Sequence, residues 1–163
     1  MQGVVLRKVG AVLVAGESGE SIRVNPDGCL DRAIHELATQ VLSTGADRLE
    51  RYEIDEDIAG YIGLSGRISL DVHVMRVAAG DQGFDDVLHY LDSQAEAVVV
   101  IGTRGAPGCA AVGPDQVVGR LGLAGLPWPI VQDARRMLKS RGPARRSYGR
   151  NGERGRADVE VWM

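Results

Sequence analysis

The chain has 163 residues, a length typical of one domain, with 44% apolar residues and a net charge of −3. No apolar run approaches the ~20 residues of a membrane-spanning helix and no signal-peptide pattern follows Arg7-Lys8, so we expect no membrane partner. Cys29 and Cys109 stand far apart without a metal-like spacing, which favours reduced thiols in a cytoplasmic protein over a disulfide scaffold.

Apolar patterns near the start of the chain predict a strand followed by a helix. The apolar run 11–15 predicts a first central strand, which ends in the polar loop 16–21. Apolar residues at three- and four-residue steps predict an amphipathic helix over 29–43. Gly45 is well placed to end that helix.

Alternating apolar and polar residues predict strands over 49–54 and 70–77. The acidic run Asp55-Glu56-Asp57 follows the first of these strands. Its carboxylates are hard oxygen ligands that suit Mg²⁺, and a solvated acidic turn is the simpler interpretation. His73 is interpreted as an ordinary residue of the second strand.

The second half of the chain contains one strongly apolar strand. The run 97–101 is uninterrupted and rich in β-branched residues, which is typical of a strand buried on both faces of a parallel sheet. Gly113, Pro114 and Asp115 are residues that favour the start of a helix. The other elements predicted here are a helix over 84–93 with Phe84, Val87, Leu88 and Leu91 inward, a helix over 114–123, an edge strand over 126–131 and a helix over 134–139 that Asp133 caps.

Three glycines spaced by two residues, Gly102, Gly105 and Gly108, follow the buried strand. Glycine tolerates positive φ and lets backbone N–H groups approach a ligand. A strand, a glycine loop and a helix N-terminus together bind phosphate in many α/β proteins. The loop therefore predicts an anion site, with a glycine-rich turn that binds nothing as the alternative.

The order of the elements predicts an α/β fold, an open, mostly parallel Rossmann-like sheet with helices on both faces. Ligands of such sheets bind at the carboxyl ends of the strands, where the loops 16–21 and 102–108 are expected to face each other. Glycine N–H groups then hold phosphates, an arginine adds a charge-assisted contact, and serines supply hydroxyls. The residues predicted to line this crevice are Ser18, Ser21, Gly102, Arg104, Gly105 and Gly108.

The C-terminal part of the chain is strongly basic. Residues 135–156 hold nine Lys and Arg residues against one acid, Glu153, so the rest of the chain is acidic. The composition of residues 140–163 predicts a flexible tail after a single α/β domain over 1–139. Within it, Val159–Trp162 alternates and fits an edge strand or a self-association segment. A solvated, disordered extension is the expected state of the tail, and nucleic-acid binding through its basic residues is the alternative.

The segment 98–108 resembles the nucleotide-loop motif of the universal stress proteins, in which an apolar strand is followed by Gly, two residues and Gly. The similarity continues in matching order across about residues 11–131. The segment 11–20 is similar to the family's first strand and its acidic-glycine-serine loop, and Gly80-Asp81 resembles the family's Gly-Asp step before a helix. The segment 129–131 is similar to the closing strand of the family.

This resemblance implies a small nucleotide-binding or regulatory module that takes ATP or another adenine nucleotide. It further implies a homodimer that acts in stress response or signalling without a defined reaction. Glu17 stands near the place of the family's adenine-contacting Asp. Asp115-Gln116 stands where the family continues with Gly and then Ser or Thr, so a member that no longer binds nucleotide is the alternative.

The segment 50–60, with a later apolar strand and arginine, resembles the catalytic domain of serine recombinases. That resemblance implies attack on a DNA phosphodiester by Ser18 or Ser21, with the basic tail on the phosphates. In that family an arginine is expected two positions before the serine, and this chain has Gly16 and Gly19 at those positions. A third hypothesis is a non-catalytic interaction protein whose acidic body and basic tail serve partners or self-assembly.

Overall fold

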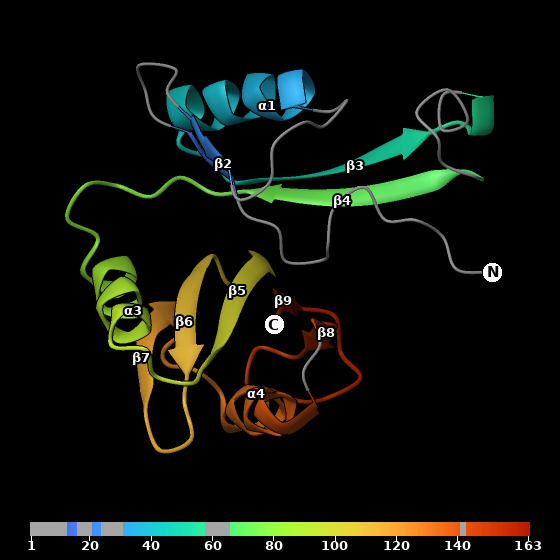
Figure 1. Cartoon of the computed structure of the whole chain (residues 1–163). Coiled ribbons are helices and arrows are strands. Elements are labelled where there is room, and N and C mark those ends of the chain that lie inside the picture. The colour runs from blue at the N-terminus through green and yellow to red at the C-terminus, as the bar shows by residue number, and fades with distance from the viewer. Residues whose placement is uncertain (1–12, 16–20, 24–30, 58–65, 141–142) are drawn as a thin grey trace. The chain divides into compact units, whose positions relative to one another are not determined.

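The computed structural model describes residues 13–15, 21–23, 31–57, 66–140 and 143–163. The chain divides into two compact units, residues 1–76 and residues 77–163 (Figure 1). Among the helices in these described ranges, none combines the length and the apolar character needed to cross a bilayer.

The N-terminal unit begins with a short antiparallel ribbon. Strand β1 (Leu13–Ala15) pairs with β2 (Ser21–Arg23), with Val14 opposite Ile22. The apolar run 11–15 is therefore not the central strand of a parallel sheet. Its partner follows it directly in the chain, and so close a connection favours antiparallel pairing.

Helix α1 (Asp31–Thr44) follows and confirms the helix predicted over 29–43. Its apolar stripe is buried, as the three- and four-residue steps require. Gly45 has a φ of +69°, and its N–H donates to the carbonyl of Val41 at 2.8 Å, so the predicted end is confirmed. The buried residues of the stripe are Ile34, Leu37, Ala38 and Val41.

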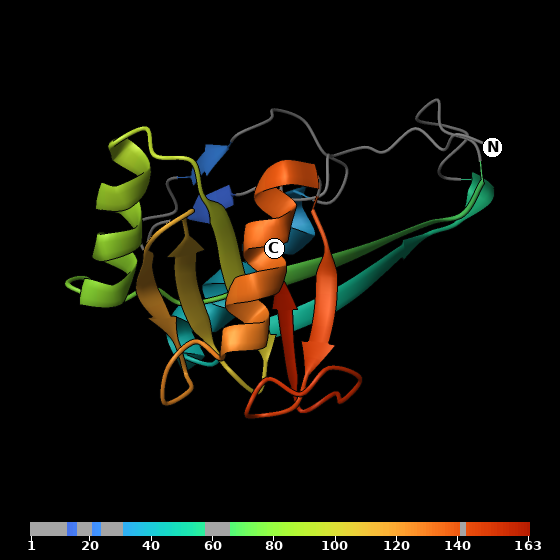
Figure 2. The same ribbon diagram turned by 90° about the horizontal axis from the view of Figure 1, so that it is seen from below.

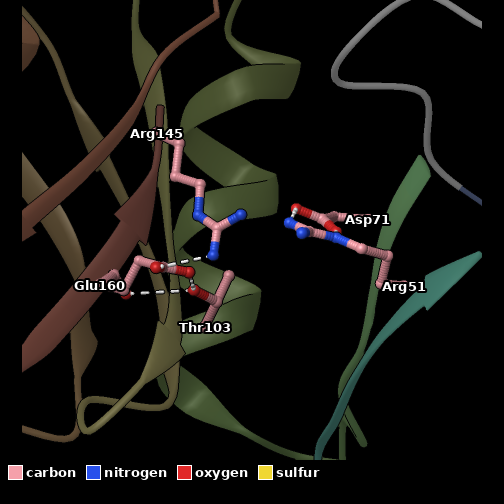
Figure 3. Close-up of polar contacts among 5 residues, drawn as sticks. All are labelled: Arg51, Asp71, Thr103, Arg145 and Glu160. Carbon is pink, nitrogen blue, oxygen red and sulfur yellow. Dashed lines mark hydrogen bonds and ion pairs between the residues drawn. The ribbon is translucent and has the colours of Figure 1, made fainter. Parts of the chain in front are cut away.

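Strands β3 (Arg48–Ile54) and β4 (Ile68–Val74) pair with each other in a second antiparallel ribbon. Both strands were expected from alternation, and both exist. Arg51 lies opposite Asp71, and its Nε and Nη2 donate to the two carboxylate oxygens at 2.7 and 3.0 Å (Figure 3). This bidentate pair fixes the register of the ribbon.

The C-terminal unit opens with helix α3 (Gln82–Asp92), which confirms the helix predicted over 84–93. Asp81 caps it, because its Oδ1 accepts from the backbone N–H groups of Gly83 at 3.0 Å and Phe84 at 3.3 Å. Val87 is buried, whereas Leu88 is exposed. The buried face of α3 is therefore narrower than the predicted apolar stripe, which included Leu88.

One sheet forms the centre of this unit. Its strands run in the order β7-β6-β5-β9-β8, and every neighbouring pair is antiparallel. Helix α4 (Trp128–Ser140) lies across a face of the sheet, and α3 packs beside β6 and β7 (Figures 1 and 2). The strands are β5 (Val98–Arg104), β6 (Gly108–Val112), β7 (Val117–Leu121), β8 (Arg145–Tyr148) and β9 (Val159–Trp162).

The apolar core of the unit lies between this sheet and α4. Valines of β5, β6 and β9 meet apolar side chains on the inner side of the helix. Fully buried aliphatic side chains of this kind are the main source of folding free energy. The core comprises Val100, Ala106, Val112, Leu121, Ile130, Val131, Ala134, Tyr148, Val159 and Val161.

The prediction of a parallel, Rossmann-like sheet with helices on both faces is wrong. The sheets of the described residues are antiparallel, and β5, β6 and β7 follow one another through short connections. Parallel strands need crossovers of a dozen or more residues, which these connections cannot supply. The helix predicted over 114–123 is replaced by strand β7 at 117–121, and most of the edge strand predicted over 126–131 is instead the first turn of α4, which begins at Trp128.

The basic C-terminal segment also differs from the flexible tail expected over 140–163. Strands β8 and β9 both belong to the sheet, and β9 lies between β5 and β8. Val159–Trp162 is therefore a strand as its alternation predicts, but an interior one. Val159 and Val161 are fully buried in the core, which explains why the segment pairs inside the sheet.

Candidate functional site

The glycine loop predicted to bind phosphate is a β-hairpin. Gly102 in β5 pairs with Gly108 at the start of β6. Between them Gly105 has a φ of +72°, and Gly108 has a φ of +129°. Both values lie in the region that favours glycine, so the turn itself requires these residues. Residues 113–116, which were expected to present a helix N-terminus to a ligand, form a turn before strand β7.

The protein's own backbone fills the space beside these glycines. A Cβ added to Gly102 would collide with the carbonyl oxygen of Ala106, and a Cβ added to Gly105 would collide with that of Asp158. Glycine is therefore needed for close packing of the chain against itself. The spacing that predicts an anion site is explained by this packing.

The other residues predicted to line the crevice lie outside the described residues or belong to different units of the chain. Glu17 and Ser18 lie outside the described residues, and Ser21 is the first residue of β2. Arg104 is exposed at the end of β5, which belongs to a different sheet from β1 and β2. The predicted crevice between adjacent parallel strands is therefore wrong. Adenine-nucleotide binding, a homodimer and attack by Ser18 or Ser21 stay predictions.

The structure instead forms a polar cluster around Asp133 on α4, which is only 6% exposed. Arg154 donates to its carboxylate from Nε at 3.1 Å and from Nη2 at 2.8 Å. The hydroxyl of Tyr148 donates at 2.9 Å, and Nη1 of Arg136 donates at 3.1 Å. A buried carboxylate is stable only when it is paired and hydrogen-bonded in this way.

The ionisation of this cluster is fixed by its contacts. The hydrogen bond from Arg154 lowers the pKa of Asp133, and the hydrogen bond from Tyr148 adds to this, although burial acts in the opposite direction. Burial and the neighbouring Asp133 carboxylate both raise the pKa of Tyr148. A general base or acid needs a pKa close to neutral pH, and both shifts lead away from it. The contacts of the cluster support a structural role, in which it links α4 to β8 and to the turn after β8.

A second carboxylate, that of Glu160 in β9, is 9% exposed. Its Oε2 accepts from Nη2 of Arg145 at 2.8 Å, and its Oε1 accepts from the hydroxyl of Thr103 at 2.9 Å (Figure 3). These contacts link β5, β9 and β8. Because side chains alternate across a sheet, Glu160 lies on the face opposite the buried Val159 and Val161.

The two buried carboxylates make stability depend on acid pH. Burial opposes ionisation of Glu160, but its hydrogen bonds from Arg145 and Thr103 outweigh this and lower its pKa. A carboxylate whose pKa is lower in the folded than in the unfolded protein stabilises the fold. This stabilisation is complete at pH values above the pKa of the unfolded protein, about 4, and it is lost as the pH falls through the pKa of the folded protein. We expect the free energy of unfolding to fall between about pH 5 and pH 2.

Urea denaturation at a series of pH values measures this loss. Glu160→Gln and Asp133→Asn should each flatten the acid limb of the stability profile, since neither amide can be protonated in that range. An acid limb as steep in both variants as in the original protein would show that other carboxylates dominate acid unfolding.

Three further arginines of the basic segment are exposed in the hairpin formed by β8 and β9. Arg146 in β8 and Arg150 and Arg156 in the following turn are exposed. None of the ion pairs seen among the described residues involves these three side chains. We call these residues the hairpin arginines. Their backbone is held in place, because the strands on either side of the turn belong to the sheet.

A scan of protein-family models and a search of curated proteins both gave no match to the chain. The geometry of the site must therefore be interpreted by its own chemistry. Within the described residues, no group of His, Cys, Asp and Glu side chains is arranged to hold a metal ion. Asp55, Glu56 and Asp57 are each exposed.

Sequence reasoning identified the basic segment but missed the carboxylates that organise it. Asp133 was expected to cap a short helix over 134–139, whereas it lies inside α4. A signal was present, because Asp133 falls between Ile130 and Ala134 on the apolar stripe of α4 and an acid there needs a cationic partner. Glu160 lies inside an alternating strand and gives no comparable signal.

Proposed function

We propose that the chain is a non-catalytic nucleic-acid-binding module, with the hairpin arginines as its phosphate-contacting surface. The observation that carries this proposal is that Arg146, Arg150 and Arg156 are exposed on an ordered strand and turn. Arginine binds phosphate with planar, multiple N–H donors, and a fixed backbone reduces the entropy lost on binding.

The carboxylates near this surface are already engaged by the protein. Asp133 and Glu160 are buried under their own arginines. Glu153 in the turn accepts from the backbone N–H and the side-chain amide of Asn151, each at 3.2 Å. Asp133 and Glu160 are therefore paired with arginines other than the hairpin arginines, whereas Glu153 keeps its negative charge, because hydrogen bonds from neutral donors do not compensate it. The pairing of Asp133 and Glu160 with other arginines supports binding to a polyanion through charge complementarity.

The test is the salt dependence of DNA binding. The variant R146Q/R150Q/R156Q is expected to bind a 20-nucleotide DNA at least about tenfold more weakly at 100 mM salt, because each lost phosphate contact lowers affinity. The slope of log affinity against log salt concentration should become shallower by about 3, or about one per arginine. Fluorescence anisotropy with labelled DNA measures both quantities.

A matched control lies in the N-terminal unit. The variant R32Q/R48Q/R67Q removes the same number of positive charges, all from exposed positions of the N-terminal unit. This control should keep the original affinity within about threefold, because the change in net charge is the only effect that it shares with R146Q/R150Q/R156Q. Equal weakening by the two triple variants would contradict a localised surface. No binding by the original protein at low salt would end the proposal. ATP added at millimolar concentration tests in the same assay whether a free nucleotide competes.

A further inference from the structure

One large aromatic side chain of the C-terminal unit stands in solvent. Trp128, the first residue of α4, is 60% exposed, the largest value among the exposed large apolar side chains of the described residues. Aromatic residues make up only 4% of the chain. The apolar core of the unit makes no use of this indole.

The indole is held by an arginine on the same face of the helix. The guanidinium carbon of Arg135 lies 5.8 Å from the centroid of the Trp128 ring, within the range of a cation–π contact. Arg135 is itself fixed, because its Nε donates to the carbonyl of Gly113 at 3.2 Å. Trp128 is thereby orientated before any partner arrives, which lowers the entropy lost on binding.

The turn between β8 and β9 packs against the residues on either side of Trp128. Gly152 has a φ of +90°, and a Cβ at this position would lie 2.7 Å from Pro127 and 2.9 Å from Pro129. Arg150 belongs to the same turn, which is closed by the N–H of Gly152 donating to the carbonyl of Gly149 at 2.9 Å. Figure 2 shows the red β8–β9 turn beside the start of α4.

An exposed, preorientated aromatic ring next to arginines is the arrangement by which proteins bind single-stranded nucleic acid. Unpaired bases stack on the ring, and the arginines contact the flanking phosphates. In a duplex the base faces are already stacked, so only the arginine contacts are retained. An acidic peptide would use the arginines without needing the ring face.

We propose that Trp128 stacks on an unpaired base and that the chain prefers single-stranded over double-stranded nucleic acid. The guanidinium of Arg135 covers one face of the indole, and the base lies on the other. Arg150 holds a neighbouring phosphate. This inference rests on the proposed nucleic-acid binding and adds the class of nucleic acid and the residue that selects it.

The experiment compares the full chain with Trp128→Ala and Trp128→Phe, on a labelled single-stranded 20-mer and on a duplex of the same sequence. Stacking on a base is worth about 1–3 kcal/mol by alanine substitution, so Trp128→Ala should weaken single-strand binding about 5- to 150-fold. Duplex binding should change by less than about twofold. Trp128→Phe should retain most of the affinity, because phenylalanine also offers a ring face.

Leu88→Ala is the matched control, since it removes another exposed apolar side chain, on α3. It should leave both affinities unchanged. Thermal unfolding of each variant confirms that the fold is retained. Addition of the single strand should also quench the tryptophan fluorescence of the original protein, and Trp128→Phe should remove this response.

The outcomes separate the two proposals. If the original protein binds neither DNA, the proposed function fails and stacking fails with it. If it binds both DNAs, is weakened by the loss of the hairpin arginines and is unchanged by Trp128→Ala, only the stacking proposal is overturned. Binding to vesicles rich in phosphatidylserine through Trp128, without binding to the single strand, would overturn it in favour of a membrane surface.

Discussion

Replacing Asp133 with Ala is expected to lower the free energy of unfolding of the C-terminal unit by about 3 kcal/mol. The carboxylate is buried and accepts hydrogen bonds from Arg154, Tyr148 and Arg136. Without it the fully buried hydroxyl of Tyr148 loses its partner, which alone costs about 1–3 kcal/mol. The guanidiniums are partly exposed and regain water, so the loss stays near the lower end of the range for a broken buried pair.

Urea denaturation followed by tryptophan fluorescence measures this loss, because both tryptophans, Trp128 and Trp162, belong to the C-terminal unit. Tyr148→Phe removes the donor while keeping the ring, and should cost about 1.5–3 kcal/mol, the usual value for a hydrogen bond to a charged group. In the double variant the two losses should not add, since the residues share one hydrogen bond.

An Asp133→Ala loss below about 1 kcal/mol would contradict this role of the cluster. Additive losses in the double variant would show that Tyr148 contributes through packing and not through its hydroxyl. Asp133→Asn is informative in either case, because it keeps an acceptor for Tyr148 and removes only the charge.

The elements that the sequence predicted well are those whose patterns are local. Helix α1 has apolar residues at regular helical steps and ends at Gly45, and α3 has Asp81 as its cap. Strand β5 is an unbroken β-branched run, so its presence is clear from residues 98–101 alone. None of these features depends on which segment the element packs against.

The direction of the strands could not be obtained in the same way. An uninterrupted apolar run is typical of a central strand in either kind of sheet, and β5 is central because β6 and β9 flank it. The residues 113–116 also contain favourable helix-start chemistry. In the structure they form a turn, with the N–H of Gly113 donating to the carbonyl of Gln116 at 2.9 Å. The pairing of β7 with β6 favours a turn and a strand here over the start of a helix.

Helix α4 illustrates a pattern whose two interpretations could have been separated. Pro127 and Pro129 suggested an edge strand, yet proline is equally suited to the first turn of a helix. The spacing of Ile130, Ala134 and Met137 is helical, and all three are buried. A search for that spacing across the prolines would have predicted one helix over the whole segment.

The candidate site was hidden from the sequence for a different reason. Composition showed a basic segment, but it could not show which cations are neutralised within the fold. Arg145 and Arg154 are held by Glu160 and Asp133, whereas Arg150 is exposed in a turn. Only the pairing of β8 with β9 separates structural arginines from those available to a partner.

Replacing Gly102 with Ala is expected to destabilise the C-terminal unit by about 3 kcal/mol, the upper part of the usual cost of overpacking. The added methyl group would collide with the carbonyl oxygen of Ala106, which is backbone and cannot turn aside as a side chain can. The hairpin between β5 and β6 must open to accept it, and Ala106 belongs to the core. Thermal or urea unfolding without any ligand measures the effect.

Gly125→Ala is the matched control, because neither Gly102 nor Gly125 has a positive φ, whereas a Cβ at Gly125 would meet nothing within 4 Å. It should be neutral or stabilising by up to about 1 kcal/mol through the unfolded chain. If Gly102→Ala were equally harmless, the packing explanation of the glycine loop would be wrong, and the space beside it would again be open to a ligand. A large loss in the absence of any nucleotide would instead show that the fold itself requires this glycine.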